Sequence, residues 1–492
     1  MAVTILLGRA TPLGDKEDDY SFRRQLLVHA QHIQRKQLPT IHTQICMAKI
    51  FETCGYWAEA EVLEEGVLLL HKQVIGEHHP DTLTSMNSLA WTYHHRGKLE
   101  EAERLGEEVL LLRKQVIGEH HPDTLTSMAN LGMTYRAHGK LEEAEKLEEQ
   151  VLLLRKQLLG KHHPDTLTSM GDLAVTYHDR GKLEEAEKLE EEVLMLCKQV
   201  IGAHHPYTLL SMSNCAMFYH RRGQLEEAEN LGEEVFLLRK QMMGQHHPHT
   251  LTSMNNLAMT YHACGKLEEA EKLGEEVFLL CNQVMGECHP QTLTSMGNLA
   301  ITYHYCGKLE KAEKIGEEVL LLQKQVIGEH HPDTLRSMGN LVLTYNNCGK
   351  LENAEKLGEK VLLLCKQVIG EHHPQTLTSM GNLALTYYHS GKLEKAEKIE
   401  EEVLLLCKQV IGESHPDTLT SMANLAMTYH HRGKLQEAEK LGDQVFLLRK
   451  KVIGKHHPHT LSSMRNLIFT YRACGKLEKA EQLKKEVLLL SA

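Results

Sequence analysis

Proline recurs at an interval of 42 residues along most of this 492-residue chain. The series comprises Pro80, Pro122, Pro164, Pro206, Pro248, Pro290, Pro332, Pro374, Pro416 and Pro458. Two glycine series keep the same interval, one from Gly55 to Gly475 and one from Gly76 to Gly454. Proline and glycine are the strongest breaks of regular structure, so this spacing cuts the chain into small, equal units. A fixed period of this length predicts a linear array of units rather than one large core.

Each unit contains two predicted helices, as the unit from Pro122 to His163 illustrates. Pro122 suits a first helical turn, because its φ is already helical and its missing N–H would lack a partner there. The first helix, helix A, is expected to end at Gly139, where glycine can adopt the left-handed conformation past a helix end. Its apolar stripe is Leu125, Met128, Leu131, Gly132 and Tyr135, spaced by three or four residues.

The second helix, helix B, is predicted in the segment from Lys140 to Leu159. Its apolar stripe is Leu141, Ala144, Leu147, Val151, Leu154 and Leu158. Glutamates crowd its first half, and Arg155 and Lys156 lie in its last turns, which complements the helix dipole. Ala144 recurs in every unit, and its small side chain is expected to allow a close approach of helix A to helix B.

One pair of 42 residues is too small to bury both stripes, so neighbouring pairs must stack. The sequence predicts an all-α solenoid of about eleven antiparallel helix pairs over residues 41–492. Residues 1–40 are expected to form an N-terminal segment that is partly disordered and contains a short helix. No polar capping helix follows Leu490, which leaves a fraying end, a surface for self-association or a cut from a longer chain as alternatives.

The charge balance argues against several classes of partner. The chain has 55 Lys and Arg against 66 Asp and Glu, a formal net charge of −11, so it has no general attraction to nucleic acid or acidic lipid. No run of about 18 apolar residues exists, and no convincing signal peptide opens the chain, so no membrane association is expected. The predicted location is cytoplasmic.

Twelve cysteines fall largely on repeated positions. Cys264, Cys306, Cys348 and Cys474 share one position, and Cys197, Cys281, Cys365 and Cys407 share another. Equivalent positions in stacked repeats lie about 10 Å apart, beyond the limit of about 7 Å between the Cα atoms of a disulfide. We therefore expect free thiols.

The pattern of Leu131, Gly132, Tyr135, Gly139 and Ala144 resembles the tetratricopeptide repeat. The 42-residue length and the phrases HPDTLTSMANLAMTY and GKLEEAEKLGEEV are similar to the repeats of kinesin light chains and nephrocystin-3. This resemblance covers about nine tenths of the chain. It implies a right-handed superhelix whose A helices line a concave groove for extended or short helical segments of partner proteins.

Two departures from these relatives bear on function. Kinesin light chains carry a long coiled coil before their repeats, whereas only about 40 residues precede them here, which puts attachment to a motor in doubt. The phrase DYSFRRQLLVHAQHIQ, from Asp19 to Gln34, resembles the connecting helix of NTPase-linked, NLR-like receptors. The segment from Gly8 to Lys16 does not match a phosphate-binding loop.

Near-identical units present the same side chains along a line, whereas an active site needs different groups that converge on one point. The sequence therefore predicts a protein that is not an enzyme and needs no cofactor. The histidines before each proline, which are paired in eight units, suggest a metal array, but repeats about 10 Å apart are too distant for shared zinc ligands. We expect these histidines to bond to the local backbone and no metal site to form.

The candidate peptide-binding residues lie on helix A. An asparagine follows the helix-A methionine by two residues, and its amide can both donate to and accept from a peptide backbone. The asparagines are Asn130, Asn214, Asn256, Asn298, Asn340, Asn382, Asn424 and Asn466, and Ser88 and Asp172 interrupt the series. The resemblance implies the same role, since asparagine at the matching position of tetratricopeptide domains clamps peptide backbone. The alternative is hydrogen bonding between neighbouring A helices.

Two further sets accompany the asparagines. Three residues beyond them lie apolar side chains, among them Met133, Met217 and Met259, which either adapt to partners or pack between helices. His94, His178, His220, His262, His304 and His430 follow the helix-A tyrosine and should edge the groove, in a binding or a solvated role.

These observations predict an interaction scaffold or adaptor that binds proteins or peptides in the groove. The alternatives are a sensor region detached from an NLR-like NTPase and a cargo adaptor like kinesin light chain.

Overall fold

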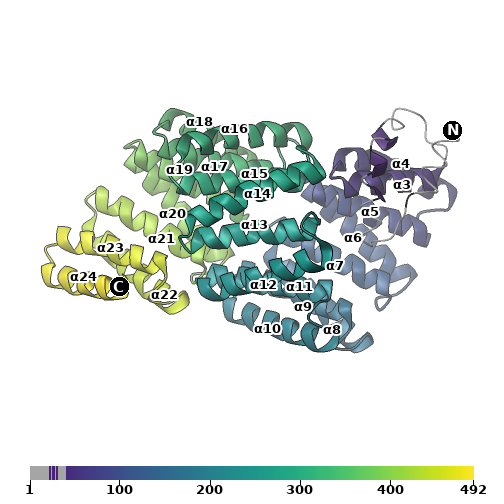
Figure 1. Ribbon diagram of the computed structural model, residues 1–492, viewed down its shortest axis with the longest axis horizontal. Coiled ribbons are helices and arrows are strands. Elements are labelled where there is room, and N and C mark those ends of the chain that lie inside the picture. Colours follow the sequence, from purple (N-terminus) through teal and green to yellow (C-terminus); the bar gives the residue numbers. More distant parts are fainter. Residues whose placement is uncertain (1–10, 12–21, 24, 28, 32–39, 492) are drawn as a thin grey trace. The chain divides into compact units, whose positions relative to one another are not determined.

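The computed structural model describes residue 11, residues 22, 23, 25–27 and 29–31, and residues 40–491. Within these residues the chain forms helices α3 to α24 and no strand, which confirms the predicted all-α array of eleven helix pairs (Figure 1). Of the predicted N-terminal segment, which includes the phrase from Asp19 to Gln34, residues 22, 23, 25–27 and 29–31 are helical, and the residues other than these, 11 and 40 lie outside the described ones.

Odd-numbered helices are the A helices and even-numbered helices the B helices, and pairs are counted from α3 and α4 as pair 1. The A helices are α3 (Ile41–Thr53), α5 (Pro80–His95), α7 (Pro122–Ala137), α9 (Pro164–Asp179), α11 (Pro206–Arg222), α13 (Pro248–Ala263), α15 (Pro290–Tyr305), α17 (Pro332–Asn347), α19 (Pro374–His389), α21 (Pro416–His431) and α23 (Pro458–Ala473). The B helices are α4 (Trp57–Val74), α6 (Leu99–Val116), α8 (Leu141–Leu158), α10 (Leu183–Val200), α12 (Leu225–Met243), α14 (Leu267–Met285), α16 (Leu309–Val326), α18 (Leu351–Val368), α20 (Leu393–Val410), α22 (Leu435–Val452) and α24 (Leu477–Ser491).

Each A helix from α5 to α23 begins with the same local structure, which α7 shows. Pro122 is its first residue, and the Nδ1 atom of His121 accepts a hydrogen bond from the Asp123 backbone N–H at 3.2 Å. The Thr124 hydroxyl donates to the carbonyl of Gly118 at 2.8 Å, which ties the loop to the helix. An imidazole thus takes the place of the usual hydroxyl or carboxylate at the helix N-terminus.

The turn between the two helices of a pair depends on glycine. Gly139 has a φ of 77°, and the N–H of Lys140 donates to the Tyr135 carbonyl at 2.8 Å. This arrangement satisfies a carbonyl at the end of α7 and requires a left-handed residue, which glycine adopts without strain. Helix α8 begins at the next residue, Leu141.

The predicted apolar stripes face the interior of each pair. Leu125, Met128 and Leu131 of α7 and Ala144 and Val151 of α8 are buried. Leu158 was predicted in the stripe of helix B but is exposed, because it lies at the end of α8 beyond the facing helix. The alanine equivalent to Ala144 is buried in every pair, as expected for the point of closest approach.

Polar contacts tie each pair to the one before it. The tyrosine of an A helix donates from its hydroxyl to an acidic side chain of the preceding B helix. The bonds join Tyr93 to Glu65, Tyr135 to Glu107, Tyr219 to Glu191, Tyr261 to Glu233, Tyr303 to Glu275, Tyr345 to Glu317, Tyr387 to Glu359, Tyr429 to Glu401 and Tyr471 to Asp443. Stacking is therefore specified by polar pairs as well as by apolar area.

A second tie occupies one position near the end of each B helix. Arg113 donates from Nη1 to the Asp123 carbonyl at 2.6 Å and to the Ser127 hydroxyl at 2.8 Å. Cys365 takes the same position in α18, and its sulfur lies 3.4 Å from the Ser379 hydroxyl. The second cysteine series therefore fills a buried site that arginine fills elsewhere. All twelve cysteines are free thiols in the structure.

The chain divides into two compact units. One comprises Met1–Asp172, Cys281–Thr294 and Leu320–Thr334, and the other Leu173–Leu280, Ser295–Val319 and Leu335–Ala492. Each unit is built of helix pairs of the kind described above.

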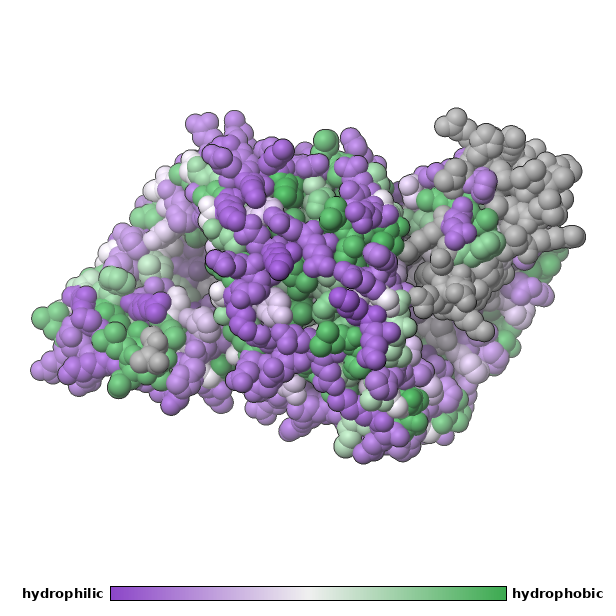
Figure 2. All heavy atoms as spheres, in the orientation of Figure 1, coloured by the Kyte–Doolittle hydropathy of each residue, from purple (hydrophilic) through white to green (hydrophobic). Residues whose placement is uncertain are grey.

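The surface combines hydrophilic side chains with isolated apolar ones, and Figure 2 shows hydrophobic residues scattered over a mainly hydrophilic face. One leucine in each of several B helices is more than half exposed, for example Leu111, Leu237 and Leu405. In the part of the chain that the structure describes, no helix combines the length and apolar character needed to span a membrane.

Candidate functional site

The predicted asparagines lie on the A helices at an accessible position. Asn130, Asn214, Asn298, Asn340, Asn382, Asn424 and Asn466 are half-buried, and Asn256 is exposed. None of them is packed into the core of its pair. The series thus offers amide groups at one helical position in successive pairs.

The asparagines differ in whether the amide contacts a neighbouring A helix. The Asn382 amide donates to the Gly339 carbonyl of the neighbouring A helix at 3.4 Å, which is the structural alternative. Among the described residues, the other seven amide side chains have no hydrogen bond to the protein. The contact between A helices is therefore the exception, and seven amides can bond to water or to a partner.

A hollow of about 220 Å³ opens between the A helices α11 and α13, with the B helix α12 behind it. Four of the predicted residues, Met217, His220, Asn256 and Met259, lie together on its wall. The other lining residues are Ser213, Ala216, Gly232, Val235, Ser253, Leu257 and Thr260. An amide, an imidazole and two thioethers that were predicted from the repeat pattern thus lie in one concave site.

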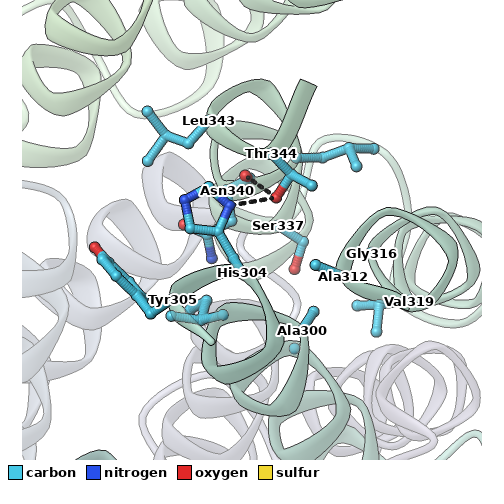
Figure 3. A pocket seen from close by; sticks show the side chains of 13 residues that line it. Ala300, His304, Tyr305, Ala312, Gly316, Val319, Ser337, Asn340, Leu343 and Thr344 are labelled. Atoms are coloured by element: carbon cyan, nitrogen blue, oxygen red, sulfur yellow. Dashed lines mark hydrogen bonds between the residues drawn. The ribbon is translucent and has the colours of Figure 1, made fainter. Parts of the chain in front are cut away.

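A second hollow, of about 160 Å³, occupies the equivalent position two pairs further along (Figure 3). It lies between α15 and α17, with α16 behind it, and His304 and Asn340 are the predicted residues on its wall. It is also lined by Gly297, Ala300, Ile301, Tyr305, Ala312, Gly316, Val319, Ser337, Leu341, Leu343 and Thr344. Recurrence of the same lining positions shows that the hollows are a property of the repeat.

His304 is fixed by hydrogen bonds at the edge of this second hollow. Its Nε2 atom lies 2.8 Å from the Asn347 side-chain nitrogen, and its Nδ1 atom lies 3.3 Å from the Thr344 hydroxyl. The Thr344 hydroxyl in turn donates to the Asn340 carbonyl at 3.2 Å, as Figure 3 shows. A neutral ring with its proton on Nδ1 satisfies all three bonds. Burial lowers the pKa of His304, which favours that neutral form.

Two of the other candidate histidines, His262 and His220, differ in their contacts. The ring of His262 lies against that of Tyr305 in a tilted arrangement, with 4.3 Å between the centroids. Burial, and to a smaller extent the nearby His304, lowers the pKa of His262. His220 is half-buried on the wall of the first hollow. The histidine set therefore shapes the rim mainly through its rings, and His304 has no free nitrogen to offer a partner.

The apolar candidates are more exposed than core residues. Met217 is 42% exposed and Phe469, at the equivalent position of α23, is 59% exposed, while Met133 and Met259 are half-buried. Fully packed methionines of the same helices, such as Met128, are entirely buried. Packing between helices consequently accounts for only part of their surface.

The histidines that precede each proline bond to the local backbone, as predicted. The Nδ1 atom of the histidine directly before the proline accepts from the backbone N–H two residues further on in α5, α7, α11, α13, α19, α21 and α23. Within the described residues, no group of three or more His, Cys, Asp or Glu side chains is placed to hold a metal ion.

The sequence analysis missed the residue that forms the floor of each hollow. This floor residue lies on helix B, four residues after the invariant alanine, and it is Gly232 in the first hollow and Gly316 in the second. Across the pairs it is glycine at Gly106, Gly232, Gly274, Gly316, Gly358 and Gly442, glutamate at Glu64, Glu148, Glu190 and Glu400, and Lys484 in pair 11. The sequence signal that could have indicated this residue is a position on helix B that changes between glycine and glutamate from pair to pair.

Comparison with known proteins identifies the repeat. One sequence profile of the tetratricopeptide repeat matches residues 39–110, 92–157, 249–320, 298–346, 333–409, 382–446 and 417–488. A second profile of the same repeat matches residues 166–207 and 208–249. No curated protein sequence matches the chain.

Two solved structures match part of the chain. Nearly identical TPR-like repeats from a Podosopora anserina protein described as a kinesin light chain are 30% identical, with a TM-score of 0.36, and the match covers 42% of this chain and 97% of that one. BtubC (BKLC) from P. vanneervenii is 19% identical, with a TM-score of 0.37, over 48% of this chain and 91% of that one. On the profile matches, which extend over most of its length, the chain belongs to the tetratricopeptide repeat family of protein-interaction scaffolds.

Proposed function

We propose that this protein is a scaffold that binds peptide segments of partner proteins in the hollows between successive A helices. The observation that carries the proposal is the hollow of pair 5, where Met217, Asn256 and Met259 meet. An apolar hollow beside an amide without a protein partner suits a peptide, since the hollow takes a side chain and the amide bonds to the backbone.

The series of amides supports an extended peptide rather than a compact ligand. Successive A helices lie about 10 Å apart, a distance that about three residues of extended chain span. One amide for each pair can therefore bond to the backbone at regular intervals, whatever the sequence of the peptide. The family generally acts through such binding rather than through catalysis.

The test uses three asparagines whose side chains have no hydrogen bond within the described residues. Partners are captured on the full chain and identified by mass spectrometry, and their peptides are then titrated by calorimetry. Combined Asn256→Ala, Asn298→Ala and Asn340→Ala substitutions should weaken binding by about 0.5–1.5 kcal/mol for each amide that contacts the peptide. The melting curve should not change.

Asn382→Ala is the matched control, because its amide already bonds to the Gly339 carbonyl. It should affect peptide binding less than each of the other three substitutions does. If the triple variant binds every identified peptide as tightly as the wild type, the groove assignment is wrong. Loss of helicity in the triple variant would instead show that the asparagines hold the fold.

A further inference from the structure

The floor residues divide the groove sites into two chemical kinds. In pairs 5 and 7 the floor is Gly232 or Gly316, and the space above it is open and mainly apolar. A methyl group added at Gly316 would lie 3.2 Å from Leu341 Cδ1, and one added at Gly232 would lie 3.3 Å from Leu257 Cδ1. The hollows therefore depend on the missing side chain.

Glutamate at the floor fills this space with a carboxyl group. Glu148 of α8 lies against Gly132 of α7, since a methyl group added at Gly132 would be 2.9 Å from Glu148 Cγ. Gly132 is at the position of Ala216 and Ala300, which line the hollows of pairs 5 and 7. The glutamate side chain thus occupies the place where the hollow lies in the glycine pairs.

Pair 3 shows which group this carboxyl takes as its partner. Arg136 of α7 brings its Nη1 atom to 3.9 Å from Glu148 Oε1, an ion-pair distance, and donates from the same atom to the Asp172 carbonyl at 3.1 Å. Glu148 is 3% exposed. Arg136 stands at the helix-A position that His304 holds in pair 7. A guanidinium entering from the groove side therefore fits a glutamate floor.

Pair 9 also has a glutamate as its floor residue, Glu400, but has no arginine at the position of Arg136. Glu400 is 5% exposed, and its Oε2 atom has no hydrogen-bond partner in the described structure. The residue at the position of Arg136 is Tyr388, which carries no charge to pair with the carboxyl. Among the described residues, no basic side chain forms an ion pair with Glu400.

The groups around Glu400 leave its carboxyl poorly compensated. The neutral side chain of Thr428 in α21 faces the carboxyl. Its charged neighbour is Glu397, which is itself paired with Arg432 and Lys434. Burial, with a smaller contribution from Glu397, raises the pKa of Glu400 to about 7. An incoming cation would supply the missing charge and stabilise the ionised carboxylate.

We propose that the floor residue selects the partner side chain, so that Gly232 and Gly316 accept apolar side chains and Glu400 accepts a lysine or arginine. This inference rests on the proposed function and specifies its ligand: a peptide with two apolar anchors and one basic anchor. The three floors follow one another at intervals of two pairs. Anchors about 20 Å apart are separated by about six residues of extended chain.

The experiment selects a random peptide library on the full chain and on variants, and compares the enriched residues. The wild type should enrich peptides with two apolar positions and one Lys or Arg position. Glu400→Gly should convert the basic preference into an apolar one. Tyr388→Arg, which copies the internal cation of pair 3, should remove the basic preference. Glu402→Gln, on the exposed side of α20, is the matched control and should change nothing.

A selected peptide then gives the size of the effect. Exchange of its basic anchor for norleucine should raise Kd on the wild type by about tenfold or more, and on Glu400→Gly by less than about twofold. Gly316→Glu tests the reverse change, and Glu400→Gly stays decisive if that variant fails to fold.

Enrichment of the same residues on the wild type, Glu400→Gly and Tyr388→Arg would overturn the inference and leave the proposed function intact. Absence of any enriched peptide on the wild type would overturn the proposed function itself, and the inference with it.

Discussion

Pairs 7 and 9 have the same core and different groove sites. In pair 7, Leu299, Tyr303 and Ala312 pack together with Ile315 beside them. In pair 9, Leu383, Tyr387 and Ala396 pack in the same way beside Ile399. The turn glycines, Gly307 and Gly391, share a φ of 73°. Residues that determine the fold are thus constant between these two pairs.

The groove side of the same two pairs differs at the floor residue and at the helix-A residue that faces it. Gly316 and His304 in pair 7 correspond to Glu400 and Tyr388 in pair 9. One pair consequently has an open apolar hollow, and the other has a buried carboxyl group. Binding chemistry can therefore change from pair to pair without disturbing the packing of helix A on helix B, because the floor residue lies at the end of that contact nearest the groove.

The largest expected effect tests whether the two cores are equivalent. Ala312→Trp and Ala396→Trp each place a large ring at a buried contact of the two helices. Each should cost about 3 kcal/mol, the upper part of the range for overpacking. Hydrogen exchange should quicken in the substituted pair and its neighbours and stay slow in pairs 1 to 3, since a stack has only local interfaces.

The two tryptophan variants should also match each other. A difference of more than about 1 kcal/mol between them would show that the cores are not equivalent and would break the comparison. Uniform loss of protection along the whole chain would contradict the stack itself.

The second effect is a pH dependence that the floor carboxyl of pair 9 should cause and that the floor glycine of pair 7 cannot cause. Burial raises the pKa of Glu400 from its usual 4.5 to about 7, so the folded state holds the proton more tightly than the unfolded state. The stability that the protonated carboxyl of Glu400 contributes is fully present below pH 4.5 and is lost as the pH rises through 7. Glu400→Gln removes this loss and should stabilise pair 9 by about 2 kcal/mol more at pH 8 than at pH 5.

Hydrogen exchange of α19 to α21 at the two pH values measures this difference. Glu402→Gln, at an exposed position of the same helix, is the control. Equal effects of Glu400→Gln at both pH values would show that the carboxyl is not held neutral by burial.

The sequence predicted the constant part of the molecule better than the variable part. Proline, glycine and alanine each have one physical reason to recur. The sequence therefore predicted the start of helix A at Pro122, the turn at Gly139 and the close contact at Ala144. Four residues on one hollow, Met217, His220, Asn256 and Met259, also followed from helical spacing.

The role of the floor residue could not be predicted from the sequence in the same way. Its glycine looks like a weak point of a helix, and its glutamate looks like one of many solvated charges on helix B. Only the packing shows that Glu148 and Glu400 point inward and are buried. The hydrogen bonds of His304 were equally hidden, because Thr344 and Asn347 belong to the next pair.

A smaller effect is expected in pair 8, where the floor residue is Gly358. Val342 stands where pairs 5 and 7 have alanine, and its Cγ1 atom lies 3.8 Å from a methyl group added at Gly358. Val342→Ala should open a hollow there at a cost of about 1–2 kcal/mol. Crystals of the variant under xenon should show xenon at this site, since apolar cavities of this kind bind it. A collapsed and empty site would show that glycine and alanine together do not suffice.

The smallest expected effect is a gain of stability that should be equal in pairs 7 and 9. Gly297 of α15 and Gly381 of α19 lie inside A helices, and a methyl group added at either would meet nothing within 4 Å. Alanine should therefore stabilise each helix by about 0.5–1 kcal/mol, because glycine loses more backbone entropy on folding. Slower local hydrogen exchange would measure the gain.

The binding consequences of these two changes should differ, because Gly297 lines the hollow above Gly316, whereas the equivalent site in pair 9 is already filled by Glu400. The new methyl group of Gly297→Ala enters the space offered to an apolar side chain and should weaken binding of an apolar anchor by about twofold to fivefold. Gly381→Ala should leave that anchor's affinity unchanged. If both variants weakened apolar binding equally, the hollow of pair 7 would not be a separate site, and the two pairs would differ in sequence without differing in function.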